Sequence, residues 1–369
     1  MALAIARLYR LGLANRNFFT RTGIIPERVY LDHAATSPLR PEAKAAMEEG
    51  FRIWANPSSP HAEGRRARAA LEDARERIKR ALGWSGELIF TSGASEALWI
   101  ALGRAKAKRR IVSAVEHDAV FRAVPDAEVV PPFDGGFDPD DLPECSGALV
   151  ALQHVNSETG TIMQPFTGGT LAAAIRTAGS ALLVDASQSA GKLPLPDADM
   201  IVVSAHKFGG PIGIGALLVR DFNLIEPSGG HERGYRQGTE NVPAAIGMAV
   251  ALETGGMEGW ATKRADQMAF AEALGQSGQL IAPGAQADHI FAVAHPALSA
   301  QALLIRLDAM GFAVSAGSAC SSGTLKKSRV LDAFGVPDDV AARTIRVSLG
   351  WSSTPEELER FAEAWASLC

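Results

Sequence analysis

The sequence predicts an α/β fold in which a mostly parallel central sheet is sandwiched by helices, followed by a smaller α+β domain. Short runs of β-branched and apolar residues recur along the chain, each bounded by polar turns, and helical or loop segments separate most of them. These runs are apolar on both faces, as is typical of parallel strands covered from both sides. After about residue 245 the composition changes, and the sequence becomes Ala-rich and helical in pattern.

The first part of the chain alternates between predicted strands and helices. Residues 29–36 form a short strand that runs into a turn, and residues 63–83 form a helix with charged residues on one face. Residues 87–93 form a strand that ends at a glycine, and a helix over residues 94–107 begins directly after it. Further strands are predicted at residues 109–117, 147–155, 181–188, 199–206 and 213–220.

The second part of the chain is predicted to form the smaller α+β layer. Residues 242–275 form a long helical stretch broken near Gly255 and Gly256, and residues 301–320 and 343–368 give helix, strand, loop, strand and helix. Because no repeat or low-complexity linker separates the two parts, we expect them to pack together. The predicted division is a basic N-terminal extension (1–26), a large domain (42–255), and a small domain built from residues 27–41 and 256–369.

Composition excludes several classes of protein. The 369 residues are 47% hydrophobic and 21% charged, which is ordinary globular composition. A net charge of −5 without a long basic run argues against nucleic acid as a direct partner. No apolar run reaches the roughly 18 residues of a membrane span. Three scattered cysteines and the lack of a C-x-x-C motif argue against a disulfide scaffold and a structural zinc site, and they suit a reducing compartment.

The N-terminal segment differs from the rest. Residues 1–26 contain four arginines and no acidic residue, so they could form a basic amphipathic helix similar to an organelle transit peptide. The alternative is an upstream extension or a surface helix. We predict a cytoplasmic protein, with organelle targeting through residues 1–26 as the alternative.

Polar residues gather where the predicted strands end, which is where ligands bind in parallel α/β sheets. A phosphate-binding turn, an imidazole, a polar pair, a carboxylate and a lysine follow one another there, and together they are the parts that hold pyridoxal phosphate. In chain order they are Gly93, Ala94, Ser95, His117, Asn156, Ser157, Asp185, Gln188, Ser204, His206 and Lys207.

Four of these residues, in two pairs, are predicted to hold the phosphate. Ala94 and Ser95 lie at a helix N-terminus, where free backbone N–H groups and the helix dipole attract anions. Ser204 and His206 follow a strand and add further phosphate contacts.

The other residues are predicted to surround the ring. Asp185 pairs with the protonated pyridine nitrogen, which keeps the ring an electron sink. Lys207 directly follows an apolar strand and forms the Schiff base. His117 lies over the ring face and transfers protons. Gln188 meets the phenolic oxygen.

The combined motifs resemble a cysteine desulfurase of the iron–sulfur and nitrogen-fixation type, within the class-V aminotransferases. The resemblance runs from about residue 28 to about residue 365. It is carried by DHAATSPLRPEA, NPSSPHAEG, FTSGASEA, VEHDAV, HVNSETGTIMQP, VDASQSAGK, SAHKFGGPIGIGAL, GGHERGYRQGTEN, SAGSACSS and IRVSLGWSST. It implies the fold of the fold-type-I transferases that use pyridoxal phosphate. The implied activity removes sulfur from L-cysteine and gives L-alanine and an enzyme-bound persulfide.

The resemblance also assigns roles that spacing alone does not. Arg346 resembles the residue that binds the substrate carboxylate, and Asn56 is similar to a residue of the substrate pocket. Thr239 resembles the residue that reaches the phosphate of the other subunit in a homodimer. Cys320 looks like the nucleophile that becomes a persulfide and passes sulfur to an iron–sulfur scaffold or another acceptor protein. No intrinsic metal site is implied, although Cys320 could transiently bind an iron–sulfur cluster.

One departure from the family pattern leaves a choice open. The family usually has two asparagines before Glu-Thr-Gly, whereas this chain has Asn156 and Ser157, so either residue could contact the ring. Two other functions also remain open. One is a lyase acting on selenocysteine or another amino acid, and the other is a non-catalytic scaffold, which the presence of Lys207 and Cys320 disfavours.

Overall fold

The computed structural model describes residues 28–132, 135–137, 143–163, 170–317 and 327–369. The predicted N-terminal extension lies outside them. A seven-stranded sheet has the strand order β2-β8-β7-β6-β5-β3-β4. Its strands are β2 (Glu87–Thr91), β3 (Arg109–Ser113), β4 (Glu128–Val130), β5 (Ala148–Gln153), β6 (Ala181–Asp185), β7 (Met200–Ser204) and β8 (Gly215–Val219).

The central strands of this sheet are parallel, as predicted. β4, β3, β5, β6 and β7 run in one direction, and only β8 runs against its neighbours β7 and β2. The reversal at β8 follows from chain length. The ten residues 205–214 between β7 and β8 hold only one short 3₁₀ turn, and a parallel return needs a longer crossover, usually with a helix.

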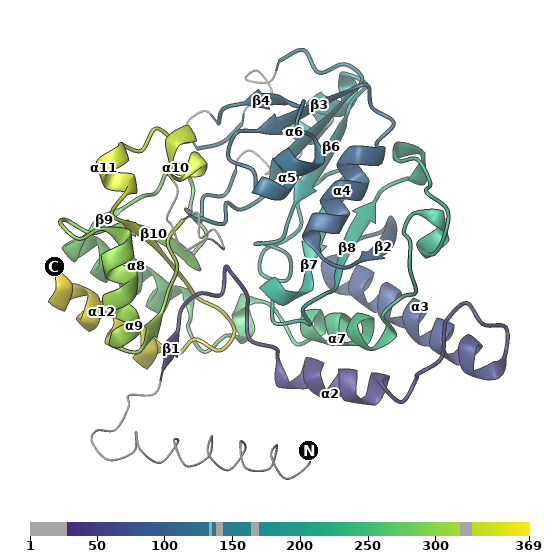
Figure 1. Ribbon diagram of the computed structural model, residues 1–369, viewed down its shortest axis with the longest axis horizontal. Helices are drawn as coiled ribbons and strands as arrows, with labels where there is room; N and C mark the ends of the chain where they lie inside the picture. Colours follow the sequence, from purple (N-terminus) through teal and green to yellow (C-terminus); the bar gives the residue numbers. More distant parts are fainter. Residues whose placement is uncertain (1–27, 133–134, 138–142, 164–169, 318–326) are drawn as a thin grey trace, which may run out of the picture.

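Helices cover both faces of the sheet (Figure 1). α4 (Ala94–Arg104) and α5 (Asp118–Ala123) bury one face with alternate strand residues such as Ile89, Val112 and Leu149. The strand residues that alternate with these, such as Leu88 and Val150, point to the opposite face and pack against helices there. Those helices are α2 (Pro41–Gly50), α3 (Ala62–Leu82), α6 (Thr170–Thr177) and α7 (Val242–Glu253).

A second core surrounds a smaller antiparallel sheet of order β12-β10-β9, seen on the left of Figure 1. Its strands are β9 (Gln279–Leu280), β10 (Ile290–Ala294) and β12 (Thr344–Ser348). The helices are α8 (Arg264–Ser277), α9 (Ala300–Ala309), α10 (Arg329–Ala333), α11 (Asp338–Ala341) and α12 (Pro355–Leu368). The helical stretch breaks between α7 and α8, as predicted. These separate cores support the two-domain division, which we retain as a proposal.

Residues near the start of the described chain join this second core. β1 (Val29–Tyr30) pairs in parallel with β11 (Phe312–Ala313), and Leu31 is fully buried there. The two cores also touch at Gly160, which has a φ of 76°. A Cβ at this position would lie 2.2 Å from the carbonyl oxygen of Ile290, so only glycine permits the close approach.

A buried ion pair stabilises the loop that leads toward α7. Arg75 and Glu232 are 2% and 1% exposed at their side chains, and the guanidinium Nη1 lies 2.7 Å from the carboxylate. The Glu232 carboxylate also accepts a hydrogen bond from the Phe90 amide at 2.8 Å. Glu232 and Arg233 have φ values of 49° and 57°, which non-glycine residues rarely adopt. The ion pair therefore holds a strained backbone in place.

We predict that Arg75→Met lowers the free energy of unfolding by about 3–5 kcal/mol, because it leaves the Glu232 carboxylate buried without its partner. Arg77→Met is the control. Arg77 lies on the same helix as Arg75 and pairs with Glu253 of α7, but the two side chains of this pair are 23% and 39% exposed. Pairs of this kind contribute about 1 kcal/mol or less. Urea unfolding of both variants measures the difference. Equal losses would contradict the role of the buried pair.

Candidate active site

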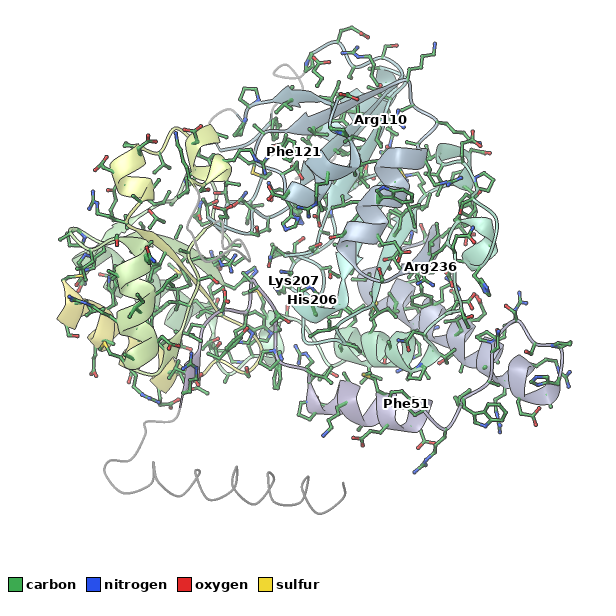
Figure 2. The ribbon with its side chains drawn as sticks, in the orientation of Figure 1. Phe51, Arg110, Phe121, His206, Lys207 and Arg236 are labelled. Atoms are coloured by element: carbon green, nitrogen blue, oxygen red, sulfur yellow. The ribbon has the colours of Figure 1, made fainter. Side chains whose placement is uncertain are left out.

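A pocket of about 810 Å³ opens where the parallel strands of the main sheet end. Most of its wall comes from residues that follow β2, β3, β5, β6 and β7. The later part of the chain completes the wall with Ser315, Gly317, Lys327, Arg329, Val330 and Arg346. In Figure 2 the labelled His206 and Lys207 lie between the two parts. The pocket gathers Ala94, Ser95, His117, Ser157, Asp185, Gln188, Ser204, His206, Lys207 and Arg346 among the predicted site residues.

One end of the pocket suits a phosphate. Helix α4 begins after Gly93, whose φ of 150° favours glycine, and no side chain caps its first turn. The amides of that turn have no acceptor within the helix and can bind an anion. Ser204 and His206 also line the pocket. Burial lowers the pKa of His206 to about 4, helped by the charge of Lys207, so the imidazole offers a hydrogen bond rather than a positive charge.

Lys207 is held at the pocket floor by the backbone. It ends a single 3₁₀ turn that follows β7, and its Nζ donates to the carbonyl oxygens of Ala34 and Ala35 at 2.6 and 2.8 Å. Burial and the charge of Arg346 together lower the pKa of Lys207 to about 8, against the opposing effects of Asp185 and Asp32. Near neutral pH this amine therefore gives up its proton more readily than an ordinary lysine, as a nucleophile or general base requires.

Asp185 and His117 flank the same space. Asp185 ends β6, and its Oδ1 accepts from the Ser187 amide at 2.8 Å. His117 precedes α5, and its Nδ1 accepts from the Ala119 amide at 3.1 Å, which assigns the ring proton to Nε2. Burial lowers the pKa of His117, and the nearby Lys207 charge acts in the same direction. A neutral imidazole is thus available to stack or to exchange a proton.

Three buried polar atoms of the pocket wall have no hydrogen-bond partner among the described residues: Ser187 Oγ, Gln188 Oε1 and Arg346 Nε. Such atoms cost about 1–3 kcal/mol each unless something satisfies them. Together with the phosphate end, the carboxylate and the lysine, they fit a polar ligand of the kind that pyridoxal phosphate and an amino acid make.

Arg346 has the geometry of an anion-binding residue. Its Nη2 lies 2.8 Å from the Asp32 carboxylate, and its Nη1 donates to the Ser157 carbonyl oxygen at 2.9 Å. Both contacts fix the plane of the guanidinium and leave Nε unpartnered within the described residues. A fixed fork of this kind suits a carboxylate.

Local turn geometry places the side chains of Asn156 and Ser157 differently relative to the pocket. Asn156 does not line the pocket; its Oδ1 accepts from the amides of Glu158 and Thr159 at 2.9 Å, and its Nδ2 donates to the Val115 carbonyl oxygen. These hydrogen bonds occupy the Asn156 side chain within its own turn, and the ring contact of either residue stays a prediction. Ser157 is the member of the pair that lines the pocket.

The pocket of a single chain does not include Asn56 or Thr239. Both residues are exposed, and the Asn56 side chain caps the Ser58 amide at 2.8 Å. Cys320 lies in residues 318–326, outside the described residues. Cys145 is partly buried and Cys369 is exposed, and neither lines the pocket.

Sequence reasoning missed several acidic residues that lie in the pocket wall or directly behind it. Asp32 pairs with Arg346, and Glu116 is fully buried beside Asp185, so burial and the Asp185 charge raise its pKa well above the ordinary value. Glu158 accepts a hydrogen bond from Ser328 at 2.6 Å. The only sequence signal for these acids was their position beside strand ends and motif residues, which did not reveal contacts more than 150 positions away.

Two absences hold for the described part of the chain. It contains no group of three or more His, Cys, Asp or Glu side chains arranged to hold a metal ion. None of its helices combines the length and apolar character that crossing a membrane requires.

Comparisons with known proteins agree with this geometry. Residues 29–361 match the family model described as Aminotransferase class-V. The chain is 36% identical over 367 residues to a protein named cysteine desulfurase IscS from Dictyoglomus turgidum, covering 89% of this chain and 91% of that one. A solved NifS-like protein superposes with a TM-score of 0.81 at 29% identity, covering 92% of this chain and 99% of that one.

A structure described as SspA in complex with cysteine superposes with a TM-score of 0.76 at 28% identity, covering 88% of this chain and 99% of that one. These likenesses confirm the predicted fold class.

We predict that cofactor-free protein captures pyridoxal phosphate with a rate that rises with pH around a midpoint near 8, the pKa of Lys207. Because the Asp32 charge raises this pKa and the Arg346 charge lowers it, Asp32→Asn should move the midpoint down and Arg346→Gln should move it up. The absorbance of the bound cofactor, followed at a series of pH values, measures the rate. A wild-type midpoint near 10.5, or shifts of the same sign in both variants, would contradict the assignment.

Proposed function

Because the chain belongs to the class-V aminotransferase family, whose members of the cysteine desulfurase type depend on pyridoxal phosphate, we propose that it is a cysteine desulfurase. The enzyme removes sulfur from L-cysteine and yields L-alanine and a persulfide on Cys320. The observation that carries this proposal is the placement of Lys207 in one pocket with Asp185 and the partly unpartnered Arg346.

Each pocket residue has a part in this reaction. Pyridoxal phosphate, when bound, withdraws electrons from the substrate Cα. Asp185 holds the pyridine nitrogen, and the first turn of α4 with Ser95, Ser204 and His206 holds the phosphate. Arg346 binds the substrate carboxylate through its fork.

Protons move through two groups of lowered pKa. Lys207, with a pKa of about 8, takes the Cα proton as a neutral amine. His117 carries a proton on Nε2 at the same wall and takes part in its transfer.

Cys320 accepts the sulfur of the substrate. Its thiolate forms a bond to the substrate sulfur while the bond from that sulfur to Cβ breaks, and Cβ receives a proton to give alanine. Gly317 and Lys327, the residues on either side of the segment 318–326, both line the pocket. Both described residues that flank the segment with Cys320 therefore lie at the pocket wall, which supports this role.

The same proposal covers partners and location. Thr239 is exposed outside its own pocket, as a residue serving a second subunit would be, and Trp54 and Ile212 are 77% and 78% exposed apolar side chains that a homodimer would cover. The persulfide passes to an iron–sulfur scaffold or another acceptor protein, and Cys320 binds an iron–sulfur cluster transiently. The compartment is the cytoplasm, or an organelle if residues 1–26 act as a targeting segment.

We predict that Cys320→Ala keeps its cofactor but loses alanine formation from cysteine, because no nucleophile then accepts the substrate sulfur. Cys145→Ala and Cys369→Ala are the matched controls and should retain alanine formation. Lys207→Ala should lose the absorbance of the lysine-bound cofactor. Alanine release and the mass of protein incubated with cysteine are the measurements. Alanine formation by Cys320→Ala near the wild-type rate would disprove the role of Cys320.

A further inference from the structure

Arg329 connects helix α10 to the main sheet at the pocket wall. It begins helix α10 and lines the pocket. Its Nη1 donates to the Ala114 carbonyl oxygen at 3.2 Å, and its Nη2 donates to the Glu116 carbonyl oxygen at 2.7 Å and to the Asp118 carboxylate at 3.0 Å. The guanidinium carbon lies 3.8 Å from the ring centroid of Phe121, which Figure 2 labels.

Ala114 and Glu116 lie in the turn that runs from β3 into α5, Asp118 and Phe121 lie in α5 itself, and the turn carries His117. The large part holds the turn from its own side, since Asn156 donates to the Val115 carbonyl oxygen at 3.2 Å and the Gln153 amide donates to the Glu116 carboxylate at 2.8 Å. Arg329 holds it from the opposite side of the pocket. The position of His117 therefore depends on a side chain that lies more than 200 residues later in the sequence.

Arg329 also stands close to the point where the chain returns from the segment that carries Cys320. Lys327 lines the pocket, and the neighbouring Ser328 donates to the Glu158 carboxylate at 2.6 Å. Ser328 and Arg329 thus attach the start of α10 to two separate turns of the main sheet.

The carboxylates facing Arg329 are Asp118, Glu116 and Glu158. Burial raises the pKa of both Glu116 and Glu158, and the positive charge of Arg329 opposes that shift. The hydrogen bonds, however, go mainly to backbone carbonyls in two directions. Arg329 makes them from two nitrogens, Nη1 and Nη2, that are held in one plane, whereas a lysine would have to make all of them from a single nitrogen.

We propose that Arg329 is a positioning residue that fixes the His117 turn against α10 and so sets one spacing between the imidazole and the end of the Cys320 segment. The proposal rests on the proposed function. Because Arg329 acts through the backbone of the turn, its loss should leave cofactor binding intact, change the environment of the bound cofactor, and slow turnover more than it weakens binding of cysteine.

The test compares Arg329→Lys and Arg329→Gln with Arg343→Lys. Arg343 lies in the same part of the molecule, donates to the carbonyl oxygens of His295 and Pro296 and pairs with Asp339 at 2.9 Å, but it does not line the pocket. The readouts are the cofactor content, the circular dichroism of the bound cofactor, and kcat and KM for alanine formation from cysteine.

We expect both Arg329 variants to bind a full complement of cofactor with altered circular dichroism and to lose at least about tenfold in kcat with a smaller change in KM, as misplaced reacting groups do. Arg343→Lys should match the wild type in all readouts. Wild-type behaviour of Arg329→Lys would overturn the proposal, because a point charge would then suffice. Equal effects in Arg343→Lys would also overturn it.

Failure of the proposed function is distinguishable from failure of this inference. A wild-type protein that binds the cofactor but forms no alanine from cysteine would refute the proposed function. The circular dichroism of the Arg329 and Arg343 variants would still decide whether Arg329 positions the turn.

Discussion

The two hydrogen bonds from Lys207 to the carbonyl oxygens of Ala34 and Ala35 are the interaction on which the pocket depends. The short segment that supplies them lies between the two cores and makes other site contacts too. The Ala34 carbonyl oxygen accepts from Gln188, and Asp32 orients Arg346. Lys207, Gln188 and Arg346, which we propose to bind cofactor and substrate, thus all contact one stretch of the chain.

That segment is itself fixed by the smaller part of the molecule. The Ala34 amide donates to the Ser348 side chain at 2.9 Å, and the Ser348 amide donates to the Leu31 carbonyl oxygen at 2.8 Å. The main sheet brings Lys207 and Asp185 to one edge, while β12 brings Arg346 and holds the segment opposite them. Neither part makes the pocket alone, so the chemistry belongs to the interface between them.

Strand-end residues could be predicted from sequence because their placement follows from local patterns. An apolar run ends at Asp185 or just before Lys207, and parallel strands bring such ends together. Asn156 could not be assigned in the same way, because its amide satisfies the backbone of its own turn, a use that depends on the turn's conformation.

Contacts between distant parts of the chain were the main omission. Arg329 and Asp32 are ordinary charged residues until the fold brings them beside a turn and an arginine far away in sequence. Strand β10 was missed as well. What distinguishes it from a buried loop is its pairing with β9 and β12.

The pairing of β1 with β11 has a consequence for how the protein matures. These strands are separated by some 280 residues, and the contacts of Ser348 with Leu31 and Ala34 span more than 310. During synthesis, strand β1 can pair only after the ribosome has made most of the polypeptide, because β11 and Ser348 lie near the end of the sequence. The floor under Lys207 is therefore assembled last, and capture of the cofactor in this pocket is an event of the completed chain.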